Sequence, residues 1–205
     1  MTGIKPKGLT EAHLRAANIG QDYWEVDFKD YKGPIEPKDY ALGYLHRLAE
    51  FKHLGVGLLF VGPNGPGKTT LAMLIMKYLA RANWDIYTTS LGEIVEQIQR
   101  GWKQGEDSAI IERCKRADFL LIDDVGKEHR GGSGFVQTVF DNLIRYRVQH
   151  RLPTFLTSNL TKVELERTYG DSVMSLLEGK LIPVTVTGKD FRKTDLKQEA
   201  RKLLC

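Results

Sequence analysis

The 205-residue sequence has few of the features that mark membrane or disulfide-stabilised proteins. Its two cysteines, Cys114 and Cys205, are too few for a disulfide framework or a cysteine-based metal site. The longest apolar run, 56–61 with its flanking glycines, is far shorter than the about 18 residues that a membrane span needs. The N-terminus, MTGIKPKG, has neither the apolar core nor the small-residue cleavage site of a secretory signal. We therefore expect a cytoplasmic protein with no membrane partner.

Basic and acidic residues nearly balance, at 30 and 26, which gives a net charge of +4 and a pI near 9.0. This small excess permits contact with nucleic acid without establishing it, because clustering on one face is what matters. The clearest basic cluster lies between Lys189 and Lys202, and it fits either a phosphate-binding surface or a solvated helix face. With 41% hydrophobic and 27% charged residues, the composition is that of an ordinary globular protein.

Composition predicts three parts, namely a polar lead-in at residues 1–37, a core at 38–193 and a basic tail at 194–205. The segment GPIEP at 33–37 is expected to break any helix before Lys38. A helical pattern follows from about residue 39 to residue 53.

Short apolar runs alternate with amphipathic helical patterns through the core. We expect strands at 57–62, 84–90, 118–124, 153–159 and 182–188. The helical pattern at 67–81 places Leu71, Leu74, Ile75 and Tyr78 on one face, and a second pattern covers 134–150. This alternation predicts an α/β protein in which a five-stranded parallel sheet is covered by helices on both faces, a three-layer sandwich. Ligands of such sheets bind beyond the carboxyl ends of the strands.

A phosphate-binding motif follows the first of these strands. It matches G-x-x-x-x-G-K-[ST] in full and reads Gly62-Pro63-Asn64-Gly65-Pro66-Gly67-Lys68-Thr69-Thr70. The glycines let backbone N–H groups converge on phosphate oxygens, and the start of the following helix adds favourable potential. Lys68 supplies a charge to the β- and γ-phosphates, and the Thr69 hydroxyl can ligate Mg²⁺. The motif predicts ATP and Mg²⁺ as ligands.

Two further strands end in polar residues that suit the same site. Asp123 and Asp124 follow the apolar residues 119–122; Asp123 is the expected Mg²⁺ partner, and Asp124 can orient or deprotonate an attacking water. Asn159 ends the sequence TSN at 157–159 and can hydrogen-bond the water or the γ-phosphate. Ser158, Asn159 and Thr161 also qualify as the N-cap of a helix beginning near Leu160, so the capping interpretation stays open.

In this order and spacing the three motifs resemble the AAA+ ATPases, and in particular the DnaC/DnaI-type helicase loaders and their IstB-like transposition relatives. The stretches 13–33, 119–128 and 187–193 also resemble segments of that family. The resemblance implies a P-loop AAA+ fold and an ATPase with Lys68, Asp124 and Asn159 in catalytic positions. It also implies that residues 62–70 hold the ATP phosphates and that Thr69 and Asp123 hold Mg²⁺.

By the same resemblance, the helical stretch 91–104 lies where loaders contact single-stranded DNA. Its Arg100, Trp102 and Lys103 form a basic and aromatic mixture suited to backbone charge and base stacking. The alternative is an ordinary amphipathic helix that packs Ile94 and Ile98 into the core. The implied partners are a hexameric replicative DNA helicase, single-stranded DNA and further copies of this chain.

The sequence departs from the family in two ways. Relatives usually carry arginines in the helix after Gly170, one of which acts as an arginine finger, whereas residues 171–177 contain none. A finger is worth about 10³–10⁵ in rate where it operates, so we expect weak self-stimulated hydrolysis unless Arg167 or Arg192 substitutes. Only a short segment precedes the core, so a helicase contact is expected to use residues 1–35, to differ from that of cellular loaders, or to be absent.

Three other functions fit the sequence less fully than a helicase loader. An IstB-like helper that delivers a transposase to DNA would share every motif above. An ATP-gated adaptor with little hydrolysis would explain the missing arginines. A small P-loop kinase is disfavoured, because no arginine-rich lid segment is visible and TSN has no role in it.

Overall fold

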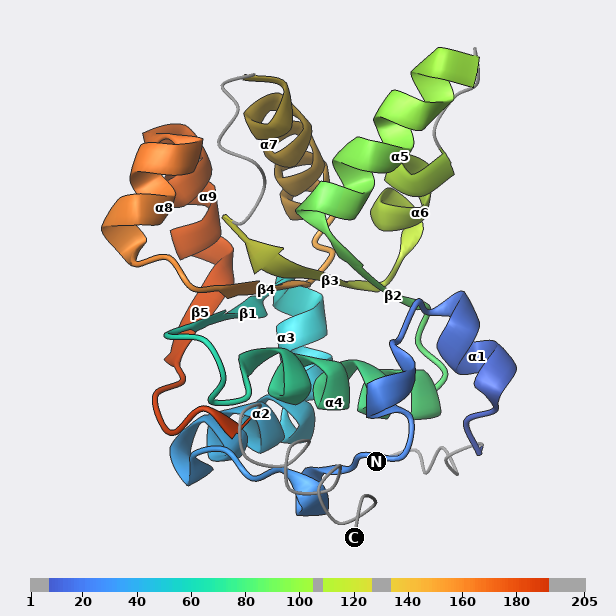
Figure 1. Ribbon diagram of the computed structural model, residues 1–205, viewed down its shortest axis with the longest axis vertical. Helices are drawn as coiled ribbons and strands as arrows, with labels where there is room; N and C mark the ends of the chain where they lie inside the picture. Colours follow the sequence, from blue (N-terminus) through green and yellow to red (C-terminus); the bar gives the residue numbers. More distant parts are fainter. Residues whose placement is uncertain (1–7, 105–108, 127–133, 192–205) are drawn as a thin grey trace, which may run out of the picture.

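The computed structural model describes residues 8–104, 109–126 and 134–191, and it places five parallel strands in one sheet (Figure 1). The strand order is β2-β3-β4-β1-β5. The strands are β1 (Gly57–Val61), β2 (Ile86–Ser90), β3 (Phe119–Val125), β4 (Thr154–Ser158) and β5 (Leu181–Thr185). The expected five-stranded parallel sheet is therefore confirmed, with each strand within two residues of its expected start.

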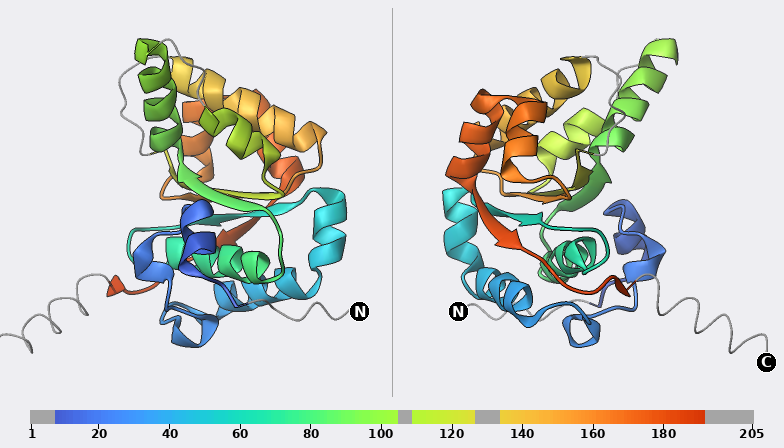
Figure 2. Two further views of the ribbon diagram at one scale, coloured as in Figure 1. Left: turned by 90° about the vertical axis from the view of Figure 1, so that its right-hand side faces the viewer. Right: turned by 60° about the vertical axis from the view of Figure 1, so that its left-hand side comes forward.

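Helices cover both faces of the sheet, which confirms the three-layer arrangement (Figure 2). On one face lie α1 (Glu11–Ala16), α2 (Ile35–His46), α3 (Leu48–Leu54) and α4 (Lys68–Arg81), with two short 3₁₀ helices at Gln21–Tyr23 and Phe28–Asp30. On the other lie α5 (Leu91–Gln104), α6 (Ala109–Arg116), α7 (Gly134–Gln149), α8 (Lys162–Tyr169) and α9 (Asp171–Lys180). None of the helices in the described ranges is long and apolar enough to cross a bilayer.

Strand residues alternate between the two cores because successive side chains point to opposite faces of a sheet. Leu58 and Phe60 of β1 pack among α1, α2 and α4, whereas Leu59 packs among α5 to α9. In β3, Phe119 and Leu121 face the first layer and Leu120 and Ile122 face the second. Burial on both faces explains why these strands read as continuous apolar runs.

The start of α2 corrects one expectation. GPIEP does not exclude a helix, since α2 begins at Ile35 with Pro34 as its N-cap residue and Pro37 in its first turn. First-turn residues have no intrahelical acceptor for their N–H groups, so proline is tolerated there. The expected helix 39–53 is also divided, because Arg47 leaves the helical conformation between α2 and α3.

In α4 the expected buried face is right for Leu71, Leu74 and Ile75 and wrong for Tyr78, which is 45% exposed. The lead-in residues 8–33 pack on this layer, where Leu14, Ile19 and Tyr31 join the core. The proposed boundaries between lead-in, core and tail remain predictions.

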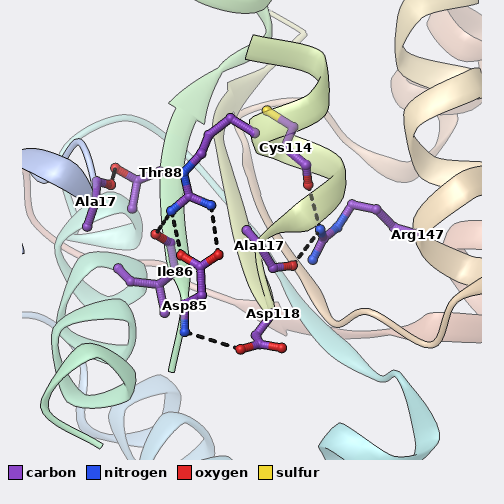
Figure 3. A network of polar contacts seen from close by, with 9 residues as sticks. Ala17, Asp85, Ile86, Thr88, Cys114, Ala117, Asp118 and Arg147 are labelled. Atoms are coloured by element: carbon purple, nitrogen blue, oxygen red, sulfur yellow. Dashed lines mark hydrogen bonds and ion pairs between the residues drawn. The ribbon is translucent and has the colours of Figure 1, made fainter. Parts of the chain in front are cut away.

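A buried arginine connects helix α7 with the amino end of the sheet and with the end of α6. Arg147 of α7 is fully buried and donates to the carbonyl oxygens of Cys114 (2.6 Å) and Ala117 (2.9 Å) (Figure 3). It also donates to Pro153 O (2.8 Å) and to Thr154 Oγ1 (2.9 Å). Burial lowers its pKa to about 10. The guanidinium thus satisfies three carbonyls, two at the end of α6 and one before β4.

Substituting Arg147 with methionine is expected to lower the free energy of unfolding by about 3 kcal/mol or more, because buried carbonyls lose their donors. Urea denaturation measures the change. Arg145→Met is the matched control on the same helix, because Arg145 is 42% exposed in its ion pair with Asp141 and should cost under about 1 kcal/mol. Equal losses for the two variants would contradict a stabilising role for the buried network.

Candidate nucleotide-binding site

The strand order brings the three sequence motifs to one edge of the sheet. The phosphate loop follows β1, the two aspartates lie at the end of β3, and TSN ends β4, which lies between β1 and β3. Because all the strands are parallel, their carboxyl ends meet at this edge. The three motifs therefore lie side by side, although Gly62 and Asn159 are 97 positions apart in the sequence.

Residues 62–67 form the loop, and Lys68, Thr69 and Thr70 begin α4. Gly62, Gly65 and Gly67 have φ angles of 143°, 99° and 104°, a region that side chains rarely adopt. A Cβ at Gly62 would lie 2.2 Å from Val186 O, and one at Gly65 would lie 2.1 Å from Asp190 Oδ1. The glycines thus allow both the turn and the close approach of the segment after β5. The start of α4 behind them directs backbone N–H groups toward a bound anion.

Lys68 is 5% exposed and connects the loop to the end of β4. Its Nζ donates to Gly62 O (2.9 Å), Pro63 O (2.6 Å) and Asn159 Oδ1 (2.6 Å). The structure thus brings together the two residues that the sequence predicts to face the γ-phosphate.

One of the three candidate N-cap residues, Thr161, does cap a helix. Thr161 is the N-cap of α8 and forms a capping box with Glu164. Ser158 Oγ instead accepts from Leu160 N and donates to Val125 O. Asn159 is therefore not the cap, and its Oδ1 accepts the hydrogen bond from Lys68.

The two predicted Mg²⁺ ligands also meet. Thr69 Oγ1 donates to Asp123 Oδ1 at 3.0 Å, and Thr157 Oγ1 donates to the same oxygen at 2.5 Å. Hydroxyl and carboxylate oxygens are the ligands that Mg²⁺ prefers, so this pair fits the ion. Thr157 received no separate role from the sequence, because its contact depends on β4 lying directly beside β3.

Asp124 sits in an unusual backbone conformation, with φ at 57°. The register between β3 and β4 shifts between Ile122 and Val125, and the Asp124 N–H donates to Thr157 Oγ1 at 2.8 Å. A bulge with a non-glycine residue at positive φ is costly and concentrates at functional sites. Thr157 therefore holds both aspartates, one through its hydroxyl proton and the other through its oxygen.

The predicted DNA residues lie elsewhere. Arg100, Trp102 and Lys103 are exposed in the last turns of α5, at the end of that helix distant from the sheet (Figure 1). Trp102 is 63% exposed, and the centroid of its ring lies 4.8 Å from that of Phe135. Ile94 is fully buried, so the amphipathic interpretation holds for the other face of the helix.

Helix α9 has no arginine in 171–177, but the fold supplies one beside it. Arg145 of α7 donates to Ser172 Oγ at 2.6 Å, a proximity that the sequence did not indicate. Arg167 is exposed on α8. Arg192 and the basic tail at 194–205 lie outside the described residues.

Comparisons with known proteins agree with this geometry. A family model described as "IstB-like ATP binding protein" matches residues 26–182. The replicative helicase loader DnaI of Bacillus subtilis (strain 168) is 26% identical over 135 residues, covering 60% of this chain and 43% of that protein. The insertion sequence IS5376 putative ATP-binding protein of Geobacillus stearothermophilus is 31% identical over 121 residues, covering 58% and 46%. This chain thus spans less than half the length of either curated relative.

The fold has solved counterparts as well. The crystal structure of the DnaC helicase loader superposes with a TM-score of 0.71 at 20% identity, covering 82% of this chain and all of that one. At this identity the likeness concerns the fold, and it confirms the expected P-loop AAA+ arrangement.

Proposed function

Because the chain belongs to the family of IstB-like ATP-binding proteins, we propose that it is an ATP-dependent helicase loader of DNA replication. Binding of ATP and Mg²⁺ at residues 62–70 configures a surface that engages a hexameric replicative helicase and single-stranded DNA. The observation that carries the proposal is the assembly of three motifs around Lys68, in a chain similar to a replicative helicase loader.

In the proposed reaction Lys68 faces the β- and γ-phosphates, while Thr69 and Asp123 hold Mg²⁺, which neutralises phosphate charge when bound. Asn159 has both acceptor and donor atoms. Since its Oδ1 accepts from Lys68, its Nδ2 is the donor that can meet a γ-phosphate oxygen. Asp124 orients and deprotonates the attacking water. Thr157 keeps the two aspartates in their separate roles.

The proposal is tested by affinity capture of the source organism's replicative helicase in the presence of ATP. The wild-type chain is expected to retain the hexameric helicase, and Lys68→Ala is expected not to. Equal capture by both chains, or none by either, would contradict an ATP-dependent loader.

A second candidate is a transposase helper, favoured by the family itself and by the insertion-sequence relative. It would use the same nucleotide site and deliver a transposase to target DNA. The same capture experiment, repeated with the transposase of a linked element, separates the two. ATP-dependent retention of the transposase alone would replace the loader by this function.

The absence of arginine in residues 171–177 favours a third candidate, an ATP-gated adaptor with little hydrolysis. A turnover assay with and without single-stranded DNA decides between an adaptor and an ATPase. Stimulated phosphate release identifies the ATPase, and ATP binding without release identifies the adaptor.

Single-stranded DNA binding is expected to depend on the end of α5. Lys103→Ala should weaken binding several-fold and make its dependence on log salt shallower by about 0.7, because one phosphate contact is lost. Trp102→Ala should weaken binding by about 1–3 kcal/mol with an unchanged salt slope, because stacking releases no counterion. Fluorescence anisotropy over a salt series measures both.

The matched control is Lys162→Ala, a lysine on α8 in an ion pair with Glu178. This variant should bind DNA as the wild type does. If Lys103→Ala and Trp102→Ala also behave as the wild type, the end of α5 does not bind DNA.

A further inference from the structure

The lead-in contacts the phosphate loop through one buried aromatic ring. Tyr31 is 9% exposed, and its ring lies between two glycines that are distant in the sequence, Gly33 and Gly67. A Cβ at Gly33 would lie 2.3 Å from Tyr31 Cζ and 2.6 Å from Pro66 O, and one at Gly67 would lie 2.9 Å from Tyr31 Cε2. Gly67 therefore has a second reason to be glycine besides the approach of phosphate, since any side chain there would displace the Tyr31 ring.

The ring of Tyr31 fills the space between the two glycines, whereas its hydroxyl makes no hydrogen bond there. Tyr31 Oη is buried and has no hydrogen-bond partner within the described residues. Burial raises the pKa of Tyr31 to about 12, so the group stays neutral. Removing an unpaired buried hydroxyl while keeping the ring is neutral or stabilising. A phenylalanine here would thus preserve the contact with Gly67.

Two cations of α4 fix the lead-in that carries this ring. Lys77 is 1% exposed, and its Nζ donates to the carbonyl oxygens of Tyr23 (2.7 Å), Trp24 (2.6 Å) and Val26 (2.6 Å). Arg81 Nη1 donates to Asp27 Oδ1 at 2.7 Å. These contacts attach the lead-in to the same helix that begins at Lys68. The segment that carries Tyr31 is therefore held in place on α4, and the position of the ring against Gly67 is fixed with it.

We propose that Tyr31 is a positioning residue of the phosphate loop, which it holds in its ATP-binding conformation through Gly67. This inference rests on the proposed nucleotide site and assigns that site a structural support outside the motif. Three loop glycines with positive φ leave many alternative conformations open to the free loop. A ring packed against Gly67 removes part of that freedom before the nucleotide arrives, and pre-organisation of this kind raises affinity.

The contact also makes the lead-in responsive to nucleotide. If the Tyr31 ring favours the ATP-binding loop, bound ATP must in turn favour the docked lead-in, because coupling between two sites is reciprocal. A ligand that displaces the lead-in would accordingly release nucleotide. ATP binding is therefore expected to increase amide protection in residues 23–33.

The test compares Tyr31→Ala and Tyr31→Phe with Leu14→Ala, a buried lead-in residue of α1 that is 6% exposed. Tyr31→Ala is expected to weaken ATP–Mg²⁺ binding by about tenfold or more, through lost pre-organisation. Tyr31→Phe should retain wild-type affinity with an equal or higher thermal midpoint. Leu14→Ala should lower the midpoint and leave affinity near the wild-type value. In hydrogen-exchange measurements, ATP should increase the protection of residues 23–33 in the wild type, Tyr31→Phe and Leu14→Ala, and should not increase it in Tyr31→Ala.

Three results would overturn the inference. Tyr31→Ala could bind ATP as tightly as Leu14→Ala, which would mean that the Tyr31 ring contributes only to the packing of the core. Tyr31→Phe could lose as much affinity as Tyr31→Ala, which would transfer the role from the ring to the hydroxyl. ATP could leave the exchange of residues 23–33 unchanged in the wild type. Lys68→Ala separates this inference from the proposed nucleotide site. If Lys68→Ala loses ATP binding, the nucleotide site is supported even where the inference about Tyr31 fails. If Lys68→Ala binds ATP as the wild type does, both the site and the inference are contradicted.

Discussion

Replacing Lys68 with alanine is expected to weaken the binding of ATP–Mg²⁺ by at least about 100-fold. Hydrogen bonds to charged groups contribute about 1.5–3 kcal/mol each, and Lys68 would meet two phosphates, so a loss of roughly 10²- to 10⁴-fold follows. Lys68 is 5% exposed, so solvent screens its attraction for phosphate only weakly. Isothermal titration calorimetry with a non-hydrolysable ATP analogue measures the change without interference from turnover.

The substitution also removes donors from Gly62 O, Pro63 O and Asn159 Oδ1, so a control for local disruption is needed. Lys180→Ala serves this purpose, because Lys180 Nζ likewise donates to a backbone carbonyl, Leu54 O at 2.9 Å, at the opposite end of the sheet. It should bind ATP normally. Unchanged ATP affinity in a folded Lys68→Ala protein would contradict the proposal that residues 62–70 bind the phosphates of ATP.

The parts of the site that the sequence predicts are those encoded locally. Residues 62–70 combine a turn, a phosphate cradle and a helix start in nine consecutive positions, so no knowledge of the fold is needed. The strand at 119–122 is also predictable from the sequence. Its residues point alternately into the two cores, so all of them must be apolar. Asp123 and Asp124 follow from the rule that ligands bind at the carboxyl ends of strands.

The residues that the sequence did not reveal depend on contacts across the fold. Thr157 orients Asp123 and Asp124 only because β4 lies between β1 and β3, and strand order is not written in any local pattern. Lys77 looks like a polar position of an amphipathic helix, yet its acceptors are carbonyls more than 50 positions earlier. Backbone carbonyls leave no signature in a sequence.

The lead-in illustrates the same limit. Its polar and turn-rich composition indicates a partner segment, and composition alone gives no sign that Tyr31 fits between Gly33 and Gly67. The failed expectation at GPIEP has another cause, since proline breaks a helix only where its missing N–H would be used. At Pro34 and Pro37 that hydrogen bond does not exist.

Replacing Asp124 with asparagine is expected to lower ATP turnover by about 10²- to 10⁴-fold, the usual contribution of a positioned general base, with ATP affinity nearly unchanged. The substitution suits the backbone, because asparagine is among the residues that best tolerate the φ of 57° found there. The N–H that donates to Thr157 Oγ1 is retained, so Asp123 should keep its place. Phosphate release measured beside ATP binding separates the chemical step from the binding step.

Asp118→Asn is the matched control at the amino end of the same strand, where the carboxylate accepts from Asp85 N at 3.2 Å far from the phosphate loop. This variant should hydrolyse ATP at the wild-type rate. Loss of binding together with turnover in Asp124→Asn would mean that the bulge itself had collapsed, and normal turnover would move the general base to another carboxylate. Retained binding with lost turnover is the result expected of a catalytic Asp124, because a general base acts on the attacking water and contributes little to the affinity for ATP.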